Sequence, residues 1–308
     1  MPRQKPWPWG ACNHPCEVRA NEGARERGNR PPQCLASTRT DELDDEVCTV
    51  RIGVHVPGDD PLAEAEARGA DAVQIFLTPP QSWRKPPVRD DEDALRASPL
   101  PVYVHAPYLI NVASASNRIR HPSRQNLQNT MEGAARIGAA GVIVHGGHVG
   151  DDDDPTIGMG HWRTTLERLE TDVSILIENT AGGENAMARQ IDRIEQLWEA
   201  IAGVDVPVGL CLDTCHLHAA GEDLLDGVKR LAALPGGISL VHLNDSKDPA
   251  GSGRDRHQNL GNGQVEVETL VEVVRIADAD VICETPGDVA DHRADLAWIR
   301  DRLSGEQA

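Results

Sequence analysis

Aromatic residues and lysines are scarce in this chain of 308 residues, which has one phenylalanine, two tyrosines and four lysines against 26 arginines. Long apolar runs are also lacking. No segment approaches the roughly 20 apolar residues that a helix needs to cross a bilayer, and the N-terminus has no hydrophobic segment typical of signal peptides. We therefore expect a cytoplasmic protein that does not contact a membrane.

Several common catalytic motifs are absent as well. The sequence contains no G-x-S-x-G nucleophile elbow, no GxxxxGK[ST] phosphate loop and no dinucleotide-binding fingerprint. Four of the seven cysteines lie before residue 49, and Cys211, Cys215 and Cys283 lie in or beside apolar runs, where buried thiols are common. The cysteine pattern therefore excludes a small secreted protein held together by disulfides.

The first 48 residues differ from the rest of the chain. They are rich in proline, arginine and glutamate and have no sustained apolar period, so they cannot bury enough surface to fold alone. Cys12, His14 and Cys16 could hold zinc, but no properly spaced second pair follows them. We expect a disordered N-terminal extension over residues 1–48, one barrel domain over 49–304 and a short tail over 305–308.

Short apolar runs alternate with amphipathic stretches from residue 50 onward. The amphipathic stretches predict helices over 61–69, 123–139, 186–202 and 291–303. Eight parallel strands with intervening helices close into a (β/α)₈ TIM barrel, an α/β fold. The predicted strands are 51–56, 72–77, 101–105, 141–145, 173–178, 207–212, 238–243 and 280–284.

A histidine or a carboxylate lies at the end of six of these apolar runs. One such residue could be an ordinary buried polar group with a hydrogen-bond partner. Six of them on six strands favour a functional site, because buried charge needs a partner or a metal and barrels carry their active sites at this face. The six residues are His105, His145, Glu178, Asp213, His242 and Glu284.

Three further side chains of metal-binding type follow in the loops. His216 comes three residues after Asp213, and Asp255 and His257 lie two apart in a glycine-rich loop. Zinc takes about four histidine or carboxylate ligands, and catalytic sites leave one position open. Nine candidates are too many for one zinc ion and about right for three, with Glu178 placed to bridge two of them.

The role of several nearby residues stays open on sequence alone. Tyr108 and Leu109 follow His105 in the chain, and they could form a wedge that presses into a base stack or simply cover the core. His55 is more easily read as a core histidine than as a ligand or a group near the site. His148 could lie beside the ligands, but the sequence does not favour that role for it.

The net charge of −19 lowers the expectation of a nucleic-acid partner, because phosphate binding needs a basic face. Divalent metal ions would offset the carboxylates of the proposed site. Basic residues also come together locally, as Arg84 with Lys85 and Arg254 with Arg256. The charge therefore does not exclude DNA.

Six segments together carry a resemblance to a known family. They resemble, in order and spacing, the endonuclease IV family of apurinic/apyrimidinic endonucleases, and the likeness runs from about residue 51 to 303. The chain is most similar to the shorter, actinobacterial-type members. The segments are VHAPYLIN (104–111), VIVHGG (142–147), LIENTAGG (176–183), CLDTCHLHAAGEDL (211–224), VHLNDSKDPAGSGRDRHQNLGNG (241–263) and ICETPG (282–287).

The resemblance implies a zinc-dependent enzyme of base-excision repair that acts as a monomer on double-stranded DNA containing abasic sites. It would hydrolyse the phosphodiester 5′ to the lesion, leaving a 3′-hydroxyl and a 5′-deoxyribose phosphate, and could also trim 3′ ends. Glu178 and Glu284 would be its catalytic carboxylates. The three zinc ions would be held by His105, His145 and Glu178, by Glu178, Asp213, His242 and Glu284, and by His216, Asp255 and His257.

Two departures from the family pattern concern the loops. The family often places an arginine where this chain has Gln81, so insertion of that loop into DNA is in doubt, although Trp83 is kept. The second histidine after the fourth strand, His148, is one residue closer to His145 than in HPGSH versions of the family. The DNA-contact candidates are Tyr108, Leu109, Gln81, Trp83 and Arg256.

Two other interpretations remain. A sugar isomerase or epimerase on a related metal barrel would need only Glu178, Asp213, His242 and Glu284. It does not require the DTCH and DRH segments that carry His216, Asp255 and His257. A DNA-damage binding protein without turnover would be indicated by a missing bridging ligand, and none is missing. The nuclease interpretation is therefore favoured.

Overall fold

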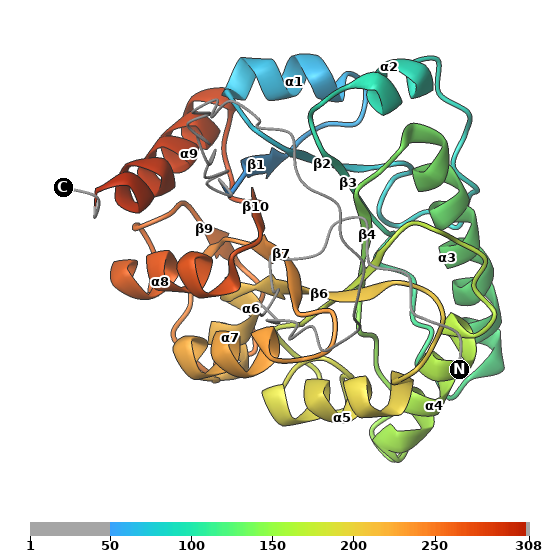
Figure 1. Cartoon of the computed structure of the whole chain (residues 1–308). Coiled ribbons are helices and arrows are strands. Elements are labelled where there is room, and N and C mark those ends of the chain that lie inside the picture. Colours follow the sequence, from blue (N-terminus) through green and yellow to red (C-terminus); the bar gives the residue numbers. More distant parts are fainter. Residues whose placement is uncertain (1–49, 306–308) are drawn as a thin grey trace, which may run out of the picture. The chain divides into compact units, whose positions relative to one another are not determined.

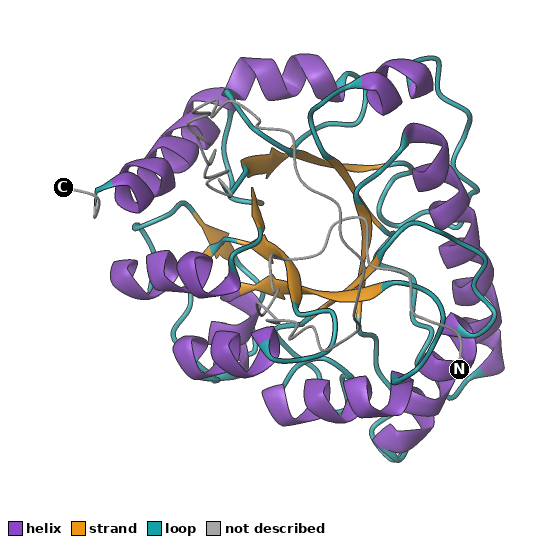
Figure 2. Ribbon diagram, in the orientation of Figure 1, coloured by secondary structure: helices purple, strands orange, loops and turns teal. Residues whose placement is uncertain are grey.

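The computed structural model describes residues 50–305, in which eight parallel strands form a closed barrel. The expectations for residues 1–48 and for the last three residues lie outside this range. Figures 1 and 2 show the ring of strands with the helices around its outside. The barrel strands are β1 (Ile52–His55), β2 (Val73–Phe76), β3 (Val102–His105), β4 (Gly141–His145), β5 (Ile175–Glu178), β6 (Val208–Asp213), β7 (Ile238–His242) and β10 (Asp280–Cys283).

The predicted TIM barrel is confirmed, and each predicted strand lies within two residues of an observed one. Sequential strands are neighbours, and β10 closes the ring between β7 and β1. The helices are α1 (Pro61–Arg68), α2 (Glu92–Ala97), α3 (Asn117–Ile137), α4 (Pro155–Leu166), α5 (Ile191–Ile201), α6 (Thr214–Ala220), α7 (Leu224–Ala232), α8 (Val267–Ala277) and α9 (Val289–Ser304). No helix in this described part is long and apolar enough to cross a membrane.

Helix boundaries differ from the prediction where loops and proline intervene. The helix expected from residue 123 begins at Asn117, and Pro122 lies inside it. A proline here lacks the N–H that would donate to the carbonyl of Arg118, so the helix forms despite the loss of one backbone hydrogen bond. The helix expected from residue 186 begins only at Ile191. Backbone bonds from Met187 to Gly147 and from Thr180 to Ala188 hold the preceding segment as a loop instead.

The glycine-rich loop after β7 contains regular structure that its sequence did not reveal. Asp245–Ser246 (β8) and His257–Gln258 (β9) pair as a small antiparallel ladder. Two residues on each side are too few to produce a recognisable alternation in the sequence. The ladder fixes the backbone at His257, so this candidate ligand is carried by an ordered element.

A layer of buried, mainly apolar side chains, here called the apolar floor, closes the interior of the barrel below the strand ends. Side chains two residues apart on a strand share a face, so the residue two before each candidate ligand points into the barrel as well. These residues form one buried cluster that separates the polar strand ends from the opposite end of the barrel. Its members on these strands are Tyr103, Ile143, Leu176, Cys211, Leu240 and Ile282.

Candidate metal centre

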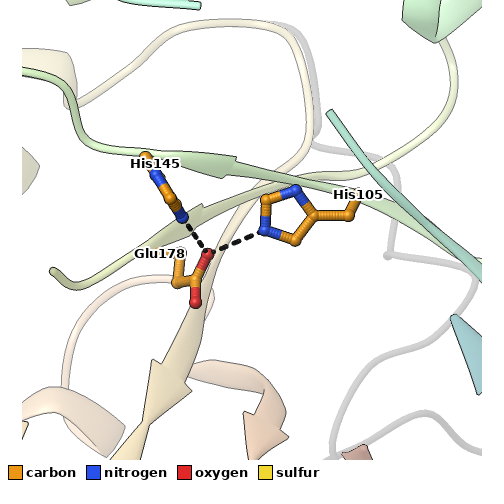
Figure 3. A group of neighbouring side chains, drawn as sticks. All are labelled: His105, His145 and Glu178. Atoms are coloured by element: carbon orange, nitrogen blue, oxygen red, sulfur yellow. Dashed lines mark hydrogen bonds and ion pairs between the residues drawn. The ribbon is translucent and has the colours of Figure 1, made fainter. Parts of the chain in front are cut away.

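The first group of candidate ligands comes from three adjacent strands. His105, His145 and Glu178 end β3, β4 and β5, and Nε2 of each histidine lies 3.2 Å from the same carboxylate oxygen, Oε2 of Glu178 (Figure 3). Ligands bound at about 2 Å around a tetrahedral zinc ion are roughly 3.3 Å apart. The spacing of these atoms therefore fits a shared metal ion.

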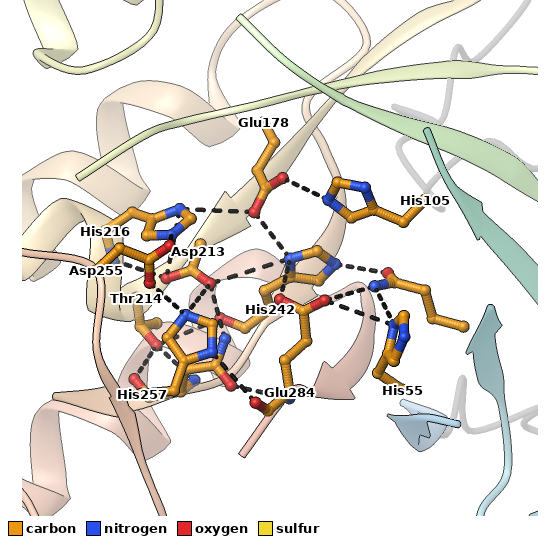
Figure 4. A network of polar contacts seen from close by, with 12 residues as sticks. His55, His105, Glu178, Asp213, Thr214, His216, His242, Asp255, His257 and Glu284 are labelled. Carbon is orange, nitrogen blue, oxygen red and sulfur yellow. Dashed lines mark hydrogen bonds and ion pairs between the residues drawn. The ribbon is translucent and has the colours of Figure 1, made fainter. Parts of the chain in front are cut away.

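The second group uses the other oxygen of Glu178. Nδ1 of His242 lies 3.0 Å from Oε1 of Glu178 and 3.3 Å from Oε2 of Glu284, with Asp213 beside them (Figure 4). One ligand atom from each of these four residues lies within 4.8 Å of all the others. The two oxygens of Glu178 thus face two different groups, which is the geometry of a bridging carboxylate.

The third group lies between helix α6 and the β8–β9 loop. Nε2 of His216 is 3.2 Å from Oδ2 of Asp255, and Nε2 of His257 is 3.0 Å from Oδ1 of the same carboxylate. Both ring nitrogens are buried and lack a partner in hydrogen-bonding geometry. Asp213 accepts from the backbone N–H of His216 at the start of α6, which ties this group to the second one.

In four of these histidines, the ring nitrogen that faces away from the carboxylates contacts a carbonyl oxygen, and this contact shows how the ring is oriented. An N–H must face a carbonyl oxygen, so the opposite nitrogen is the one directed at the carboxylates. That nitrogen holds either a second proton or a cation, and both place positive charge among the carboxylates. The ring contacts are His105 Nδ1 to Ala106 O (2.7 Å), His216 Nδ1 to Asn179 O (2.8 Å), His257 Nδ1 to Glu284 O (3.2 Å) and His242 Nε2 to Gln74 Oε1 (2.7 Å).

These observations fit a divalent metal of the zinc type. The donor atoms are imidazole nitrogens and carboxylate oxygens, which zinc prefers, and each oriented ring has a carbonyl partner as metal-bound histidines usually do. The nine residues predicted as ligands all belong to one of the three groups. A further combination, Asp213, Cys215 and His257, is weaker because burial raises the pKa of the Cys215 thiol to about 12.

At neutral pH the metal-free site contains protonated histidines and ionised carboxylates. Burial opposes charging of His216 and His257, but Asp213 and Asp255 outweigh it and raise the pKa of these rings to about 10 and about 9. Burial would also raise the pKa of Glu178 and Glu284, yet His242 lowers both, to about 2 for Glu284. The carboxylates are therefore ionised and ready to act as ligands.

The raised pKa values predict that zinc uptake releases protons. At about pH 7.5 the metal-free protein carries protons on His216 and His257, whose pKa values are near 10 and 9, and a metal takes only the neutral rings. We expect more than one proton released per chain and weaker binding as the pH falls. Titration calorimetry in buffers of different protonation enthalpy measures the release; a binding enthalpy independent of the buffer would contradict it.

The same pKa shifts determine how the stability of the metal-free protein changes with pH. Histidines whose pKa is raised stabilise the folded state fully below about pH 6.5, and this contribution is lost as the pH rises through about 9 to 10. Metal-free protein should therefore unfold more easily in alkaline buffer. Zinc-loaded protein should lack this loss in the same range, which urea titrations of both forms would show.

Three amides that the sequence analysis did not assign complete the site. Asn179 accepts from the backbone of Asp213 (2.7 Å), Asn244 donates to its carboxylate (2.7 Å), and Gln74 contacts His242. All three are fully buried. A signal was present for Gln74, because a glutamine within the apolar run AVQIF must find buried partners.

Four of the five candidate DNA-contact residues lie on neighbouring loops after β2 and β3, and Arg256 lies between β8 and β9. The backbone N–H of Tyr108 donates to Pro80, so the loop of Gln81 and Trp83 is joined to the loop of Tyr108 and Leu109. Tyr108 is 50% exposed, and its ring stacks on His145 with centroids 5.4 Å apart. It therefore lines the first ligand group while half of its surface remains exposed to solvent.

The other candidates differ in exposure. Gln81 and Trp83 are exposed and Leu109 is half-buried. Arg256 is exposed, and its guanidinium is held by two hydrogen bonds of 2.6 and 2.5 Å to Asp248. Neither His55 nor His148 belongs to a group of three or more possible ligands within residues 50–305.

Comparison with known proteins identifies the family. A family model described as a xylose isomerase-like TIM barrel matches residues 62–302. A protein named "Probable endonuclease 4" from Mycobacterium leprae (strain TN) is 57% identical over 254 residues, which cover 82% of this chain and 99% of the relative. This chain belongs to the endonuclease IV family. The protein of the same name from Mycobacterium tuberculosis (strain ATCC 25177 / H37Ra) is 59% identical over 251 residues, covering 82% and 98%.

Solved structures agree with this family. Endonuclease IV from Thermus thermophilus superposes with a TM-score of 0.70 at 31% identity, covering 83% of this chain and 99% of that one. A D-tagatose 3-epimerase-like protein reaches a TM-score of 0.67 at 17% identity, with coverage of 83% and 100%. At that identity the second likeness shows only the shared barrel. The resemblance expected from the sequence is confirmed.

Proposed function

We propose that this protein is a zinc-dependent endonuclease of base-excision repair that cleaves duplex DNA 5′ to abasic sites. The products would be a 3′-hydroxyl and a 5′-deoxyribose phosphate, and 3′ ends could be trimmed at the same site. The names of the endonuclease IV relatives support action on DNA. The observation that carries the proposal is that the oxygens of Glu178 face two ligand groups, with a third beside them.

Each ligand group would hold one zinc ion. Glu178 would bridge the first two ions, and the third would be held at the rim by residues of α6 and the β8–β9 loop. When bound, divalent metals stabilise the attacking and leaving oxygens of an in-line displacement at phosphorus. The three sets are His105, His145 and Glu178; Glu178, Asp213, His242 and Glu284; and His216, Asp255 and His257.

The protein's own residues would keep the carboxylates of the site ionised and would determine the side from which DNA approaches. Glu178 and Glu284 are the proposed catalytic carboxylates, and both are ionised at neutral pH, since His242 lowers the pKa of each. The apolar floor below them closes the barrel on one side. Substrate must therefore approach from the strand ends, where the loops of Tyr108 and Trp83 lie. We further propose that the enzyme acts as a cytoplasmic monomer.

A sugar isomerase would use a subset of the same site. Glu178, Asp213, His242 and Glu284 form a complete four-residue group, and the epimerase-like barrel has the same fold. The third group has no role in such an enzyme. In this structure it is nevertheless joined to the second group, because Asp213 accepts a hydrogen bond from the backbone N–H of His216. The third group therefore favours the nuclease.

A substrate that blocks the lyase route tests the proposal directly. We expect the purified protein to bind close to three zinc ions per chain and to nick duplex DNA at a tetrahydrofuran abasic analogue. Metal content can be measured by mass spectrometry of the digested protein, and nicking on denaturing gels. An undamaged duplex and a chelator-treated sample are the controls. Intact analogue DNA after incubation with zinc-loaded protein would refute the function.

Tyr108 offers a test of the DNA-facing surface. Tyr108→Ala removes an exposed ring that a base could stack on, and stacking on an aromatic side chain is worth about 1–3 kcal/mol, so we expect abasic DNA to bind roughly 10-fold more weakly. Tyr108→Phe keeps the ring and is the matched control. Because the ring stacks on His145, the zinc content of both variants must be measured. Unchanged DNA affinity in Tyr108→Ala would contradict the contact.

A further inference from the structure

A buried glutamine on β2 contacts three polar residues of the site. Gln74 is completely buried and points into the barrel. Its Oε1 lies 2.7 Å from Nε2 of His242, and its Nε2 lies 2.6 Å from Oε1 of Glu284 and 3.0 Å from Nδ1 of His55. An amide in an apolar interior is costly unless its hydrogen bonds are made, and these three contacts make them.

The position of Gln74 in the ring of strands is informative. Six strands end in candidate ligands, whereas β1 and β2, which lie between β10 and β3 in the closed barrel, contribute His55 and Gln74. These two residues fill the gap between Glu284 and His105. Gln74 therefore supports the ligands from the one side of the barrel that supplies none.

The direction of the amide follows from Glu284. An ionised carboxylate only accepts hydrogen bonds, so the NH₂ of Gln74 must face Glu284 and its oxygen must face His242. That oxygen in turn requires a hydrogen on Nε2 of His242. The lone pair of the neutral ring is then on Nδ1, the atom that lies 3.0 Å from Glu178 and 3.3 Å from Glu284.

We propose that Gln74 is a positioning residue that holds His242 in its metal-binding tautomer and fixes the carboxylate of Glu284. The inference rests on the proposed function, because it assumes that the second ligand group takes a metal. Gln74 is out of reach of DNA, being fully buried, and acts only through these two residues. Partners that orient metal ligands in this way typically change metal affinity or activity by roughly 10- to 100-fold when removed.

The substitution Gln74→Met tests this role, because methionine fills a similar volume without the hydrogen bonds. We expect one of the three zinc ions to be lost to a competing chelator at a roughly 10- to 100-fold lower chelator concentration. On the tetrahydrofuran duplex kcat should fall while KM stays the same. Tyr103→Phe is the matched control. Tyr103 is the register partner of Gln74 on β3, and its substitution also removes one partly buried hydrogen bond, to Asp280, away from the ligands.

The outcomes separate this inference from the proposed function. Wild-type zinc affinity in Gln74→Met would overturn the role of Gln74 while a wild-type protein that binds zinc and nicks DNA keeps the function. A wild-type protein that does neither would overturn the function and this inference with it. A drop in zinc affinity in Tyr103→Phe equal to that in Gln74→Met would also overturn it, because any lost buried hydrogen bond would then have the same effect.

A measurement on the wild-type protein avoids the question of whether the variant folds. In long-range proton–nitrogen spectra of the zinc-loaded protein, His242 should be protonated on Nε2 and bound through Nδ1. The rings of His105, His216 and His257 should show the reverse tautomer, because each donates from Nδ1 to a backbone carbonyl. A His242 protonated on Nδ1 would refute the proposal.

Discussion

Glu178→Ala should abolish strand cleavage at an abasic site. The two oxygens of Glu178 face separate ligand groups, His105 and His145 on one side and His242 on the other. Its removal would take a ligand from two of the proposed metal ions and would leave His105, His145 and His242 without their shared carboxylate. Because bound metals contribute several kcal/mol of transition-state stabilisation, a loss of about 4 kcal/mol or more corresponds to a rate at least roughly 10³-fold lower.

Single-turnover nicking of the tetrahydrofuran duplex measures this loss, together with the zinc content. Glu184→Ala is the matched control, because it removes an exposed carboxylate from the loop that follows the same strand. We expect fewer than three zinc ions per chain in Glu178→Ala and unchanged content in the control. Cleavage within about 10-fold of the wild-type rate would show that Glu178 is not a bridging ligand, since such a change is only about 1.4 kcal/mol.

The barrel could be predicted from sequence because its strands are buried on both faces. Such strands form continuous apolar runs, and eight of them alternating with helices leave few other architectures. The β8–β9 ladder was not predicted, because a pairing of two residues on each side has no periodicity. The start of α3 was placed too late because a proline such as Pro122 usually marks a helix boundary, whereas this helix runs through it.

Six of the candidate ligands could also be predicted, because a polar residue that ends an apolar strand is conspicuous. Gln74 lies inside such a strand and its partners, His242 and Glu284, are 168 and 210 residues away in the chain. No local pattern can indicate contacts at that separation. The orientation of each ring likewise depends on a carbonyl from another segment, as with His216 and Asn179.

The sequence also could not indicate which distant residues contact the exposed part of the site. Tyr108 was read either as a wedge or as a cover for the core, and the structure places it against His145 with half of its surface exposed. Its position depends on the bond from its backbone to Pro80 in another loop. The ring stacks on His145 and is also half exposed, so its position agrees with a covering role and leaves surface for a contact with DNA.

Asp255→Ala should separate the nuclease from an isomerase of the same fold. Asp255 provides both carboxylate oxygens of the third group, one facing His216 and one facing His257. The third group has no residue in common with the other two groups. We expect the zinc content to fall from about three to about two per chain, and nicking to fall roughly 10²- to 10³-fold, as when one source of charge stabilisation is removed from a transition state.

Retention of the second group makes this variant decisive. Glu178, Asp213, His242 and Glu284 keep all of their contacts in Asp255→Ala, so a sugar isomerase built on them would keep its metal and its activity. Asp151→Ala removes another exposed carboxylate from the loop after β4 and controls for the change in charge. If Asp255→Ala nicked DNA at the wild-type rate with two zinc ions bound, the third group would have no part in cleavage. The reason for preferring a nuclease over an isomerase would then be lost.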